Sequence, residues 1–329
     1  MEKQGTCPLR RALAYALPSP DSPPARVDIF RSVFRREVRS EVLNRAAEQE
    51  ISDGARDDAP SASARGCEID LKTQAFYCET LRELNAAGAE YLVGGAYALA
   101  RYTGVVRHTK DFDIFTRRRD RDRVLEVLAA RGCVTEVTFP HWLAKAYCRD
   151  GSGNFIDVIY SSGNGVAAVD DEWFEHAVGG EVLGCAALLC PAEEIIWSKG
   201  FVQERERFDG ADIYHLLRQC APVLDWTRLL RRFGTHWRVL LGHLVNFGFV
   251  YPGERDRVPA WVMDELVARL QEETRRAPAR ERLCRGTLLS REQYLIDLSD
   301  WGYRDARLDE ASMTPEEIQH WTDAIGKIA

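Results

Sequence analysis

The fold is decided by residues 93–115, which read VGGAYALARYTGVVRHTKDFDIF. Two glycines close a short apolar strand at 91–95 and open a short helix that ends near Gly104. The segment DFDIF (111–115) then alternates polar and apolar residues, as a strand with one buried face does. The stretch therefore predicts a strand, a short helix and a second strand.

The alternation places Asp111 and Asp113 on one face of the second strand, with Phe112 and Ile114 on the other. Carboxylates two positions apart on a strand lie about 6.6 Å apart. That spacing suits a pair of divalent cations, which lie about 3.5–4 Å from each other in two-metal sites. Taken alone, such a pair is more often two solvent-facing acids on an edge strand, so the interpretation depends on its surroundings.

The surroundings supply a phosphate-binding turn and a third acid. Gly94 and Gly95 precede a helix start, where backbone N–H groups and the helix dipole favour an anion. A tight strand-to-helix turn explains the two glycines equally well. Asp157 lies inside the apolar strand predicted at 155–161, where a carboxylate is costly unless it is paired or binds a metal. The alternative for Asp157 is a solvated face of that strand.

Together these residues resemble the signature of the polymerase-β-like nucleotidyltransferase superfamily. Arg107, Thr109, Asp111 and Asp113 are similar to the Arg-x-Thr-x-Asp-x-Asp run of its bacterial branches, which include antibiotic nucleotidyltransferases and AbiEii-like toxins. The resemblance covers about residues 69–217, and it specifies the superfamily but not the acceptor. The loop before the Asp-x-Asp strand is longer than in many members.

The resemblance implies transfer of NMP from an NTP to an acceptor hydroxyl, with release of pyrophosphate. It implies two Mg²⁺ or Mn²⁺ ions held by candidate catalytic residues Asp111, Asp113 and Asp157. It also implies that the nucleotide is bound by Gly94, Gly95, Arg107, Thr109 and Lys199. The acceptor stays open between a small molecule, a protein and an RNA. A catalytically inactive binding or regulatory module, such as a toxin–antitoxin component, is the alternative.

The helical segment after the catalytic strands carries further charged residues. Lys199 shares a helix face with an apolar residue, so it either reaches solvent or points toward the triphosphate. Asp209, followed by Asp212, is interpreted as the N-cap of a helix at 210–219. Arg205 and Arg207 either reach phosphates or pair with nearby acids. We interpret two histidines, His108 and His141, as non-catalytic, and three tail aromatics, Trp301, Tyr303 and Trp321, as packing residues of a helical lid.

The expected fold class is α/β (α+β), with a small mixed sheet flanked by helices and a helical C-terminal half. The expected divisions are a mostly flexible extension at 1–66, a nucleotidyltransferase catalytic domain at 67–190 and a helical domain at 191–329. Helical spacing after Pro191 predicts helices at 192–203, 210–219, 226–233, 237–247, 259–273 and 290–299.

Composition narrows the function further. A net charge of −7 argues against a general nucleic-acid binder, although the stretch 101–131 is basic. The acidic charge suits a cationic small-molecule acceptor, whereas the basic stretch suits a tRNA. The chain has nine cysteines and no Cys-x-x-Cys pair, which favours reduced thiols over a zinc site. The sequence contains no apolar run long enough to span a membrane, and we expect a cytoplasmic protein.

Overall fold

The computed structural model describes residues 71–107, 109, 111–147 and 153–326. The predicted flexible extension at 1–66 and His108 lie outside these residues. Twelve α-helices are described: α2 (Leu71–Ala86), α3 (Gly95–Thr103), α4 (Arg121–Ala130), α5 (Asp171–Glu175), α6 (Ala192–Gly200), α7 (Gly210–Cys220), α8 (Trp226–Phe233), α9 (Trp237–Val250), α10 (Ala260–Arg275), α11 (Leu295–Ser299), α12 (Arg307–Glu310) and α13 (Pro315–Asp323). The strands are β1 (Leu92–Val93), β2 (Asp111–Phe115), β3 (Val134–Phe139), β4 (Leu143–Tyr147), β5 (Phe155–Ile159), β6 (Val178–Val182), β7 (Cys185–Leu189), β8 (Leu283–Cys284) and β9 (Arg304–Asp305).

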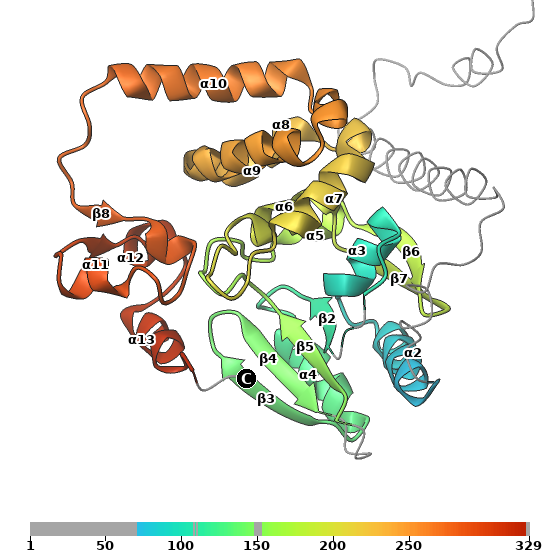
Figure 1. The fold of residues 1–329 in the computed structure, drawn as a ribbon. Coiled ribbons are helices and arrows are strands. Elements are labelled where there is room, and N and C mark those ends of the chain that lie inside the picture. The colour runs from blue at the N-terminus through green and yellow to red at the C-terminus, as the bar shows by residue number, and fades with distance from the viewer. Residues whose placement is uncertain (1–70, 108, 110, 148–152, 327–329) are drawn as a thin grey trace, which may run out of the picture.

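Seven of the strands form one mixed sheet in the order β3-β4-β5-β2-β1-β7-β6. Strands β2 and β5 run parallel, as do β1 and β7, and the other neighbours are antiparallel. Helices flank this sheet, and the chain after β7 is mostly helical (Figure 1). The predicted fold class, a mixed sheet flanked by helices and followed by a helical half, is confirmed.

The sequence patterns did not predict strands β6 and β7, which extend the sheet beyond β1. They also misplaced some boundaries, since the predicted helix at 290–299 is helical only in α11. Helix α13 begins with a capping box: the Thr314 side chain accepts a hydrogen bond from the backbone N–H of Glu317, and Pro315 is the first helical residue. Such capping supplies partners for backbone groups that a helix end leaves unpaired.

One face of the central strands is covered by helices α2 and α4. The buried residues of this cluster include Leu81 of α2, Phe112 of β2, Leu128 of α4 and Ile156 of β5. Alternation along β2 and β5 then turns the intervening acids to the opposite face of the sheet. The packing that buries Phe112 thus fixes the direction of Asp111 and Asp113.

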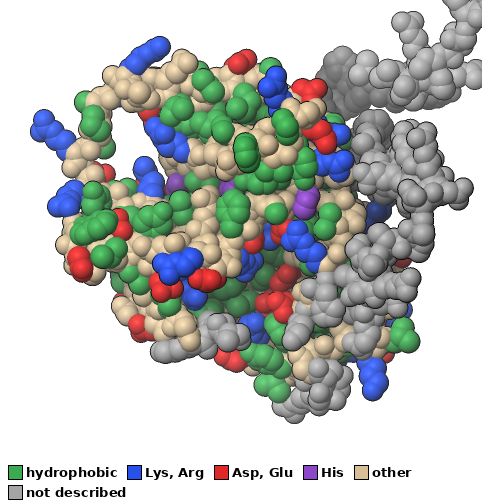
Figure 2. Space-filling view, viewed as in Figure 1, with side chains coloured by type: hydrophobic (Ala, Val, Ile, Leu, Met, Phe, Trp, Pro, Cys, Tyr) green, Lys and Arg blue, Asp and Glu red, His purple; other side chains and the backbone are tan. Residues whose placement is uncertain are grey.

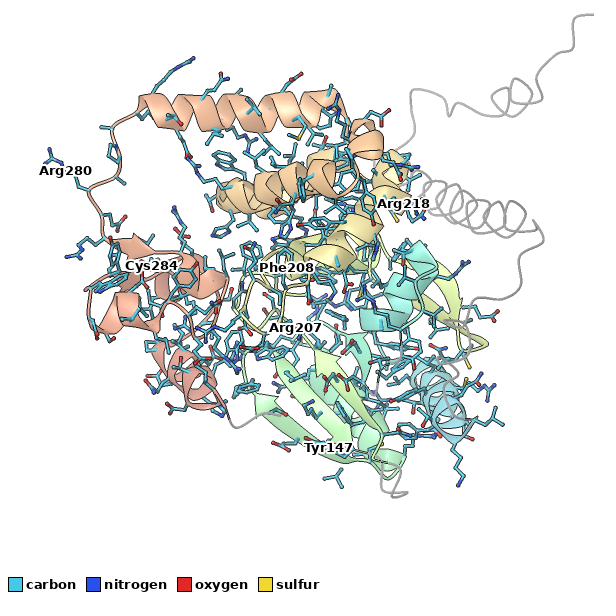
Figure 3. The ribbon with its side chains drawn as sticks, in the orientation of Figure 1. Tyr147, Arg207, Phe208, Arg218, Arg280 and Cys284 are labelled. Carbon is cyan, nitrogen blue, oxygen red and sulfur yellow. The ribbon has the colours of Figure 1, made fainter. Side chains whose placement is uncertain are left out.

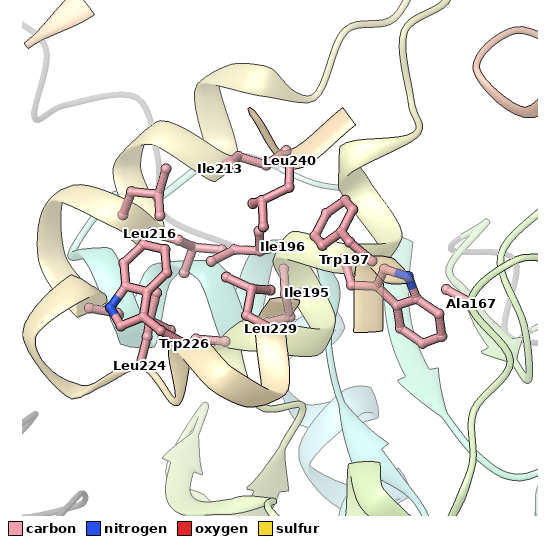
Figure 4. Packing of buried hydrophobic residues seen from close by; sticks show 14 of the residues in the cluster. Ala167, Ile195, Ile196, Trp197, Ile213, Leu216, Leu224, Trp226, Leu229 and Leu240 are labelled. Atoms are coloured by element: carbon pink, nitrogen blue, oxygen red, sulfur yellow. The ribbon is translucent and has the colours of Figure 1, made fainter. Parts of the chain in front are cut away.

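A second core lies among helices α6–α10. Figure 4 shows Ile195 and Ile196 of α6 packed among Leu216, Trp226 and Leu229 of the neighbouring helices. Helix α3, the short helix after the two glycines, packs against α7. This contact joins the second core to the seven-stranded sheet.

The segment after α10 returns to the sheet and packs against its edge. The Asn164 side chain donates to the Leu288 carbonyl, and the Ser312 backbone N–H donates to the Gly165 carbonyl. The Trp321 ring lies so close to Gly163 that an added Cβ would be 2.3 Å from it. Trp321 is therefore a packing residue, as predicted, whereas Trp301 is 55% exposed.

Two further findings concern the described residues only. The cysteines among the described residues are all buried: Cys78, Cys133, Cys185, Cys190, Cys220 and Cys284. No helix in the described ranges combines the length and the apolar character that crossing a membrane requires.

Candidate active site

The three predicted acids meet on one face of the sheet. In the pairing of β2 with β5, Asp113 lies directly opposite Asp157, and Asp111 lies opposite Phe155. In the pairing of β5 with β4, Lys145 lies opposite Asp157. Lys145, Asp157 and Asp113 therefore form a row across three neighbouring strands, which we call the charged row. Asp111 extends this row at the adjacent position along β2.

The fold disfavours the charged form of the Asp113 carboxylate. Burial, together with the negative charge of Asp157, raises the pKa of Asp113 from 3.8 to about 7. The positive charges of Lys199 and Arg207 oppose this shift but do not cancel it. A carboxylate in this position gains from any cation that reaches it.

The two glycines make room for this arrangement. Gly95 has φ +54°, and a Cβ there would lie 1.7 Å from Asp113 Oδ2. At Gly94 a Cβ would lie 2.2 Å from the Phe115 ring, and the Gly94 backbone N–H donates to the Asp113 carbonyl at 3.0 Å. The predicted phosphate contact remains a prediction, but both glycines are already required to bring β1 and α3 against Asp113.

Asp157 is paired, which is one of the two states expected for a carboxylate in an apolar strand. Lys145 Nζ donates to Asp157 Oδ1 at 2.8 Å, and the side chains are 19% and 14% exposed. Burial still raises the pKa of Asp157, while the hydrogen bond and charge of Lys145 lower it. Sequence analysis did not identify Lys145. Its signal was a single lysine in the alternating strand LAKAY, but only the strand register reveals its partner.

Lys199 lies in a second charged cluster beside the row. Its Nζ contacts Asp209 Oδ2 at 2.6 Å and Asp212 Oδ2 at 2.9 Å. Arg207 pairs with Asp209 at 3.1 Å, and Arg107 pairs with Asp212. Figure 3 shows Arg207 between the helical half and the sheet.

The prediction for Asp209 is confirmed in its position but not in its hydrogen bond. Asp209 occupies the N-cap position of α7, but its side chain makes no capping hydrogen bond. Its carboxylate accepts from Lys199 and Arg207 instead. Charged donors form stronger hydrogen bonds with a carboxylate than a neutral backbone N–H does, which explains the competition.

Two other predicted residues have local partners. The Thr109 hydroxyl accepts from the Asp111 backbone N–H at 3.2 Å, so it supports the start of β2. Burial lowers the pKa of His141 to about 4, and its Nε2 donates to the Gly163 carbonyl at 3.0 Å. His141 also packs against Trp321, which fits the non-catalytic role expected of it.

Acidic and basic side chains gather in the recess between the sheet and the helices (Figure 2). Within the described residues, no three of the His, Cys, Asp and Glu side chains already form a cage for a metal ion. Magnesium is usually bound by one or two carboxylates together with substrate phosphates, however, and not by an all-protein cage. Asp113 and Asp157, opposite each other and beside the glycine turn, fit that kind of site.

Comparison with known proteins finds a family match for the segment that contains these acids. Residues 78–176 match the family model described as aminoglycoside-2''-adenylyltransferase. The matched segment includes Asp111, Asp113 and Asp157, and it ends before Lys199. A search of curated proteins finds no match to the chain.

Three solved structures share a weaker likeness. The antibiotic-resistance factor ANT(2'')-Ia has 16% identity and a TM-score of 0.36, over 53% of this chain and 98% of that one. The lincosamide antibiotic adenylyltransferase LnuA has 16% identity and a TM-score of 0.33, over 45% and 96%. A nucleotidyltransferase-like protein from Paracoccidioides brasiliensis has 15% identity and a TM-score of 0.37, over 56% and 91%. Likenesses this weak carry no weight for the function.

Proposed function

Because residues 78–176 are a domain of the polymerase-β-like nucleotidyltransferase superfamily, we propose that this nucleotidyltransferase transfers AMP from ATP to a hydroxyl of a cationic, antibiotic-like small molecule. The observation that carries the proposal is the register that sets Asp113 opposite Asp157 within the matched segment. Pyrophosphate is the second product. We further propose a cytoplasmic location and the division into catalytic and helical domains expected from the sequence.

In this proposal Asp111, Asp113 and Asp157 hold two divalent cations, Mg²⁺ or Mn²⁺, with the nucleotide phosphates as further ligands. When bound, the cations supply charge neutralisation for the phosphoryl oxygens. Asp157, which lies between Asp113 and Lys145 in the row, would accept the proton of the acceptor hydroxyl. The protein's contribution is positioning, since transfer at phosphorus needs the attacking and leaving oxygens in line.

The nucleotide is expected at the end of the row that lies nearest to Gly95. The first turn of α3 offers backbone N–H groups that have no partner within the helix. Lys199, Arg107 and Arg207 bring positive charge to the same recess, where they now pair with Asp209 and Asp212. A triphosphate carries more negative charge than either carboxylate, so it would compete with Asp209 and Asp212 for these three basic side chains.

The acceptor is proposed from the name of the matched family and from charge. An aminoglycoside carries several ammonium groups, and the chain has a net charge of −7. Acidic surfaces raise the local concentration of cationic ligands and their rate of encounter. A protein or RNA acceptor, which the sequence left open, has no comparable support from the matched segment.

The test is transfer of label from [α-³²P]ATP to a panel of aminoglycosides in the presence of Mg²⁺. We expect labelled aminoglycoside with the native chain and none with Asp113→Asn. The matched control is Asp122→Asn, which removes an acid that is 72% exposed on α4 and should keep full activity. Binding of ATP without transfer to any acceptor in a cell extract would contradict the proposal and favour the inactive binding module.

A further inference from the structure

Lys145 contacts a proposed metal ligand and has no assigned role. Its ammonium lies 2.8 Å from Asp157 Oδ1 and 4.3 Å from the centre of the Phe155 ring. Strand β3 adds Glu136 opposite Lys145 in the register. The ammonium is thus placed by backbone pairing on both sides and by contact with an aromatic face, which is a favourable position for a cation.

This contact occupies one oxygen of the Asp157 carboxylate. Oδ1 is bonded to Lys145, which lies on the side of β5 away from Asp113. The remaining oxygen, Oδ2, is the one left for a second partner. Both side chains are largely buried, so water has little room to replace this ion pair.

This inference rests on the proposed function. We propose that Lys145 is a positioning residue, which leaves Asp157 a single carboxylate oxygen for the divalent cation. It thereby makes the site selective for small octahedral cations over Ca²⁺. Mg²⁺ and Mn²⁺ accept single carboxylate oxygens in an octahedral shell. Ca²⁺ takes more ligands and often binds both oxygens of a carboxylate. A carboxylate that offers one oxygen therefore disfavours Ca²⁺.

A purely electrostatic role for Lys145 makes a different prediction. If the ammonium only contributed a positive charge near the site, its removal would strengthen the binding of every divalent cation by a similar factor. If it blocks one oxygen, its removal should strengthen Ca²⁺ binding much more than Mn²⁺ binding. The ratio of the two dissociation constants separates these roles.

The experiment measures Mn²⁺ binding to the full chain by electron paramagnetic resonance and Ca²⁺ binding by competition with Mn²⁺. For Lys145→Met we expect Ca²⁺ to bind about tenfold more tightly, because both oxygens of Asp157 become available; tenfold is the scale on which neighbours of a metal ligand change metal affinity. Mn²⁺ affinity should change much less, by under about threefold, because Mn²⁺ needs only one of these oxygens. Lys145→Arg should weaken both ions, because a guanidinium can hold both carboxylate oxygens.

The control is Arg123→Met, which removes a positive charge that is 58% exposed on α4 and should leave both affinities unchanged. Thermal melting of each variant establishes that it is folded. An equal gain for both ions in Lys145→Met would overturn the proposal. If neither the native chain nor its variants bind Mn²⁺, the metal site of the proposed function is contradicted as well. Normal Mn²⁺ binding with an unchanged ratio of Ca²⁺ to Mn²⁺ affinity in Lys145→Met contradicts only the role of Lys145.

Discussion

Two regions of the molecule bury pairs of carboxylates, and they balance the charge in different ways. In the helical half, Glu193 and Glu194 are both fully buried on α6. Arg228 lies 2.7 Å from Glu193 and also contacts Glu194, and Arg232 contacts Glu194 at 3.2 Å. In the charged row, Lys145 is the only cation among the described residues that contacts an acid, and it bonds to Asp157 and not to Asp113.

The two regions differ in whether the buried acids are balanced by cations of the chain itself. Burial raises the pKa of Glu194 to about 6, although two arginines oppose the shift. The pKa of Asp113 rises to about 7, because the group is buried and its nearest charged neighbour in the row is another acid. An ion pair completed within the chain supports the fold, whereas acids without a contacting cation can be stabilised by one that binds. The predictions below test this contrast.

The largest effect is expected from Asp113→Asn. Activity should fall by about four orders of magnitude, or ~5.5 kcal/mol, because a cation held by this site would supply several kcal/mol of charge stabilisation in the transition state. Single-turnover AMP transfer measures the loss. The melting temperature of the variant should equal or exceed that of the native chain, since a repulsive charge has been removed. A melting temperature well below the native value would mean that Asp113 supports the fold.

Arg228→Met should lower the stability of the fold, whereas Asp113→Asn should not. Removing this arginine leaves Glu193 and Glu194 buried with less positive charge, which typically costs about 3–5 kcal/mol of unfolding free energy. Urea denaturation measures this change. The matched control is Arg231→Met, whose guanidinium is 58% exposed in its pair with Glu172 and should contribute at most about 1 kcal/mol. Equal losses in the two variants would remove the contrast between the clusters.

An intermediate effect is expected from Gly95→Ala. The new Cβ would displace the Asp113 carboxylate, and a misplacement of this kind can reduce activity by about a hundredfold. Gly88→Ala is the control, because Gly88 has a similar φ of +63° and nothing within 4 Å of an added Cβ. Both variants should lose similar stability, but only Gly95→Ala should lose AMP transfer. Normal transfer by Gly95→Ala would show that Asp113 need not stay in its present position.

The smallest effect is a pH dependence of stability. The pKa of Asp113 is raised in the fold to about 7, so the folded chain keeps a proton that the unfolded chain releases near pH 4. The contribution of Asp113 to stability is therefore highest at low pH and declines as the pH rises to about 7. Without divalent cations, Asp113→Asn should be more stable than the native chain at pH 8, with little difference at pH 4. Urea denaturation at both pH values tests this.

Much of the site could be predicted because its residues lie in short segments with clear alternation. The strand DFDIF fixes which face holds Asp111 and Asp113, and the apolar strand around Asp157 has the same pattern. Strand register depends on long-range pairing, however, and no local pattern states that Lys145 lies opposite Asp157. The sequence could therefore supply the acids but not their neighbour.

Other errors have similarly specific causes. Strand β6 contains Gly179 and Gly180, and glycine in a strand interior is unfavourable on local grounds. It forms because β7 pairs with it and with β1. Asp209 lies at the predicted N-cap position but does not cap the helix, because its carboxylate pairs with Lys199 from another helix.

The packing of Trp321 against Gly163 has a consequence for synthesis on the ribosome. Helix α13 is translated well after the loop it covers, so the nascent sheet emerges with the surface around Gly163 and Trp142 still exposed to water. Nascent chains fold domain by domain, and exposed apolar surface at this stage invites aggregation or chaperone binding. The seven-stranded sheet thus acquires its full edge packing only after α13 has left the ribosome.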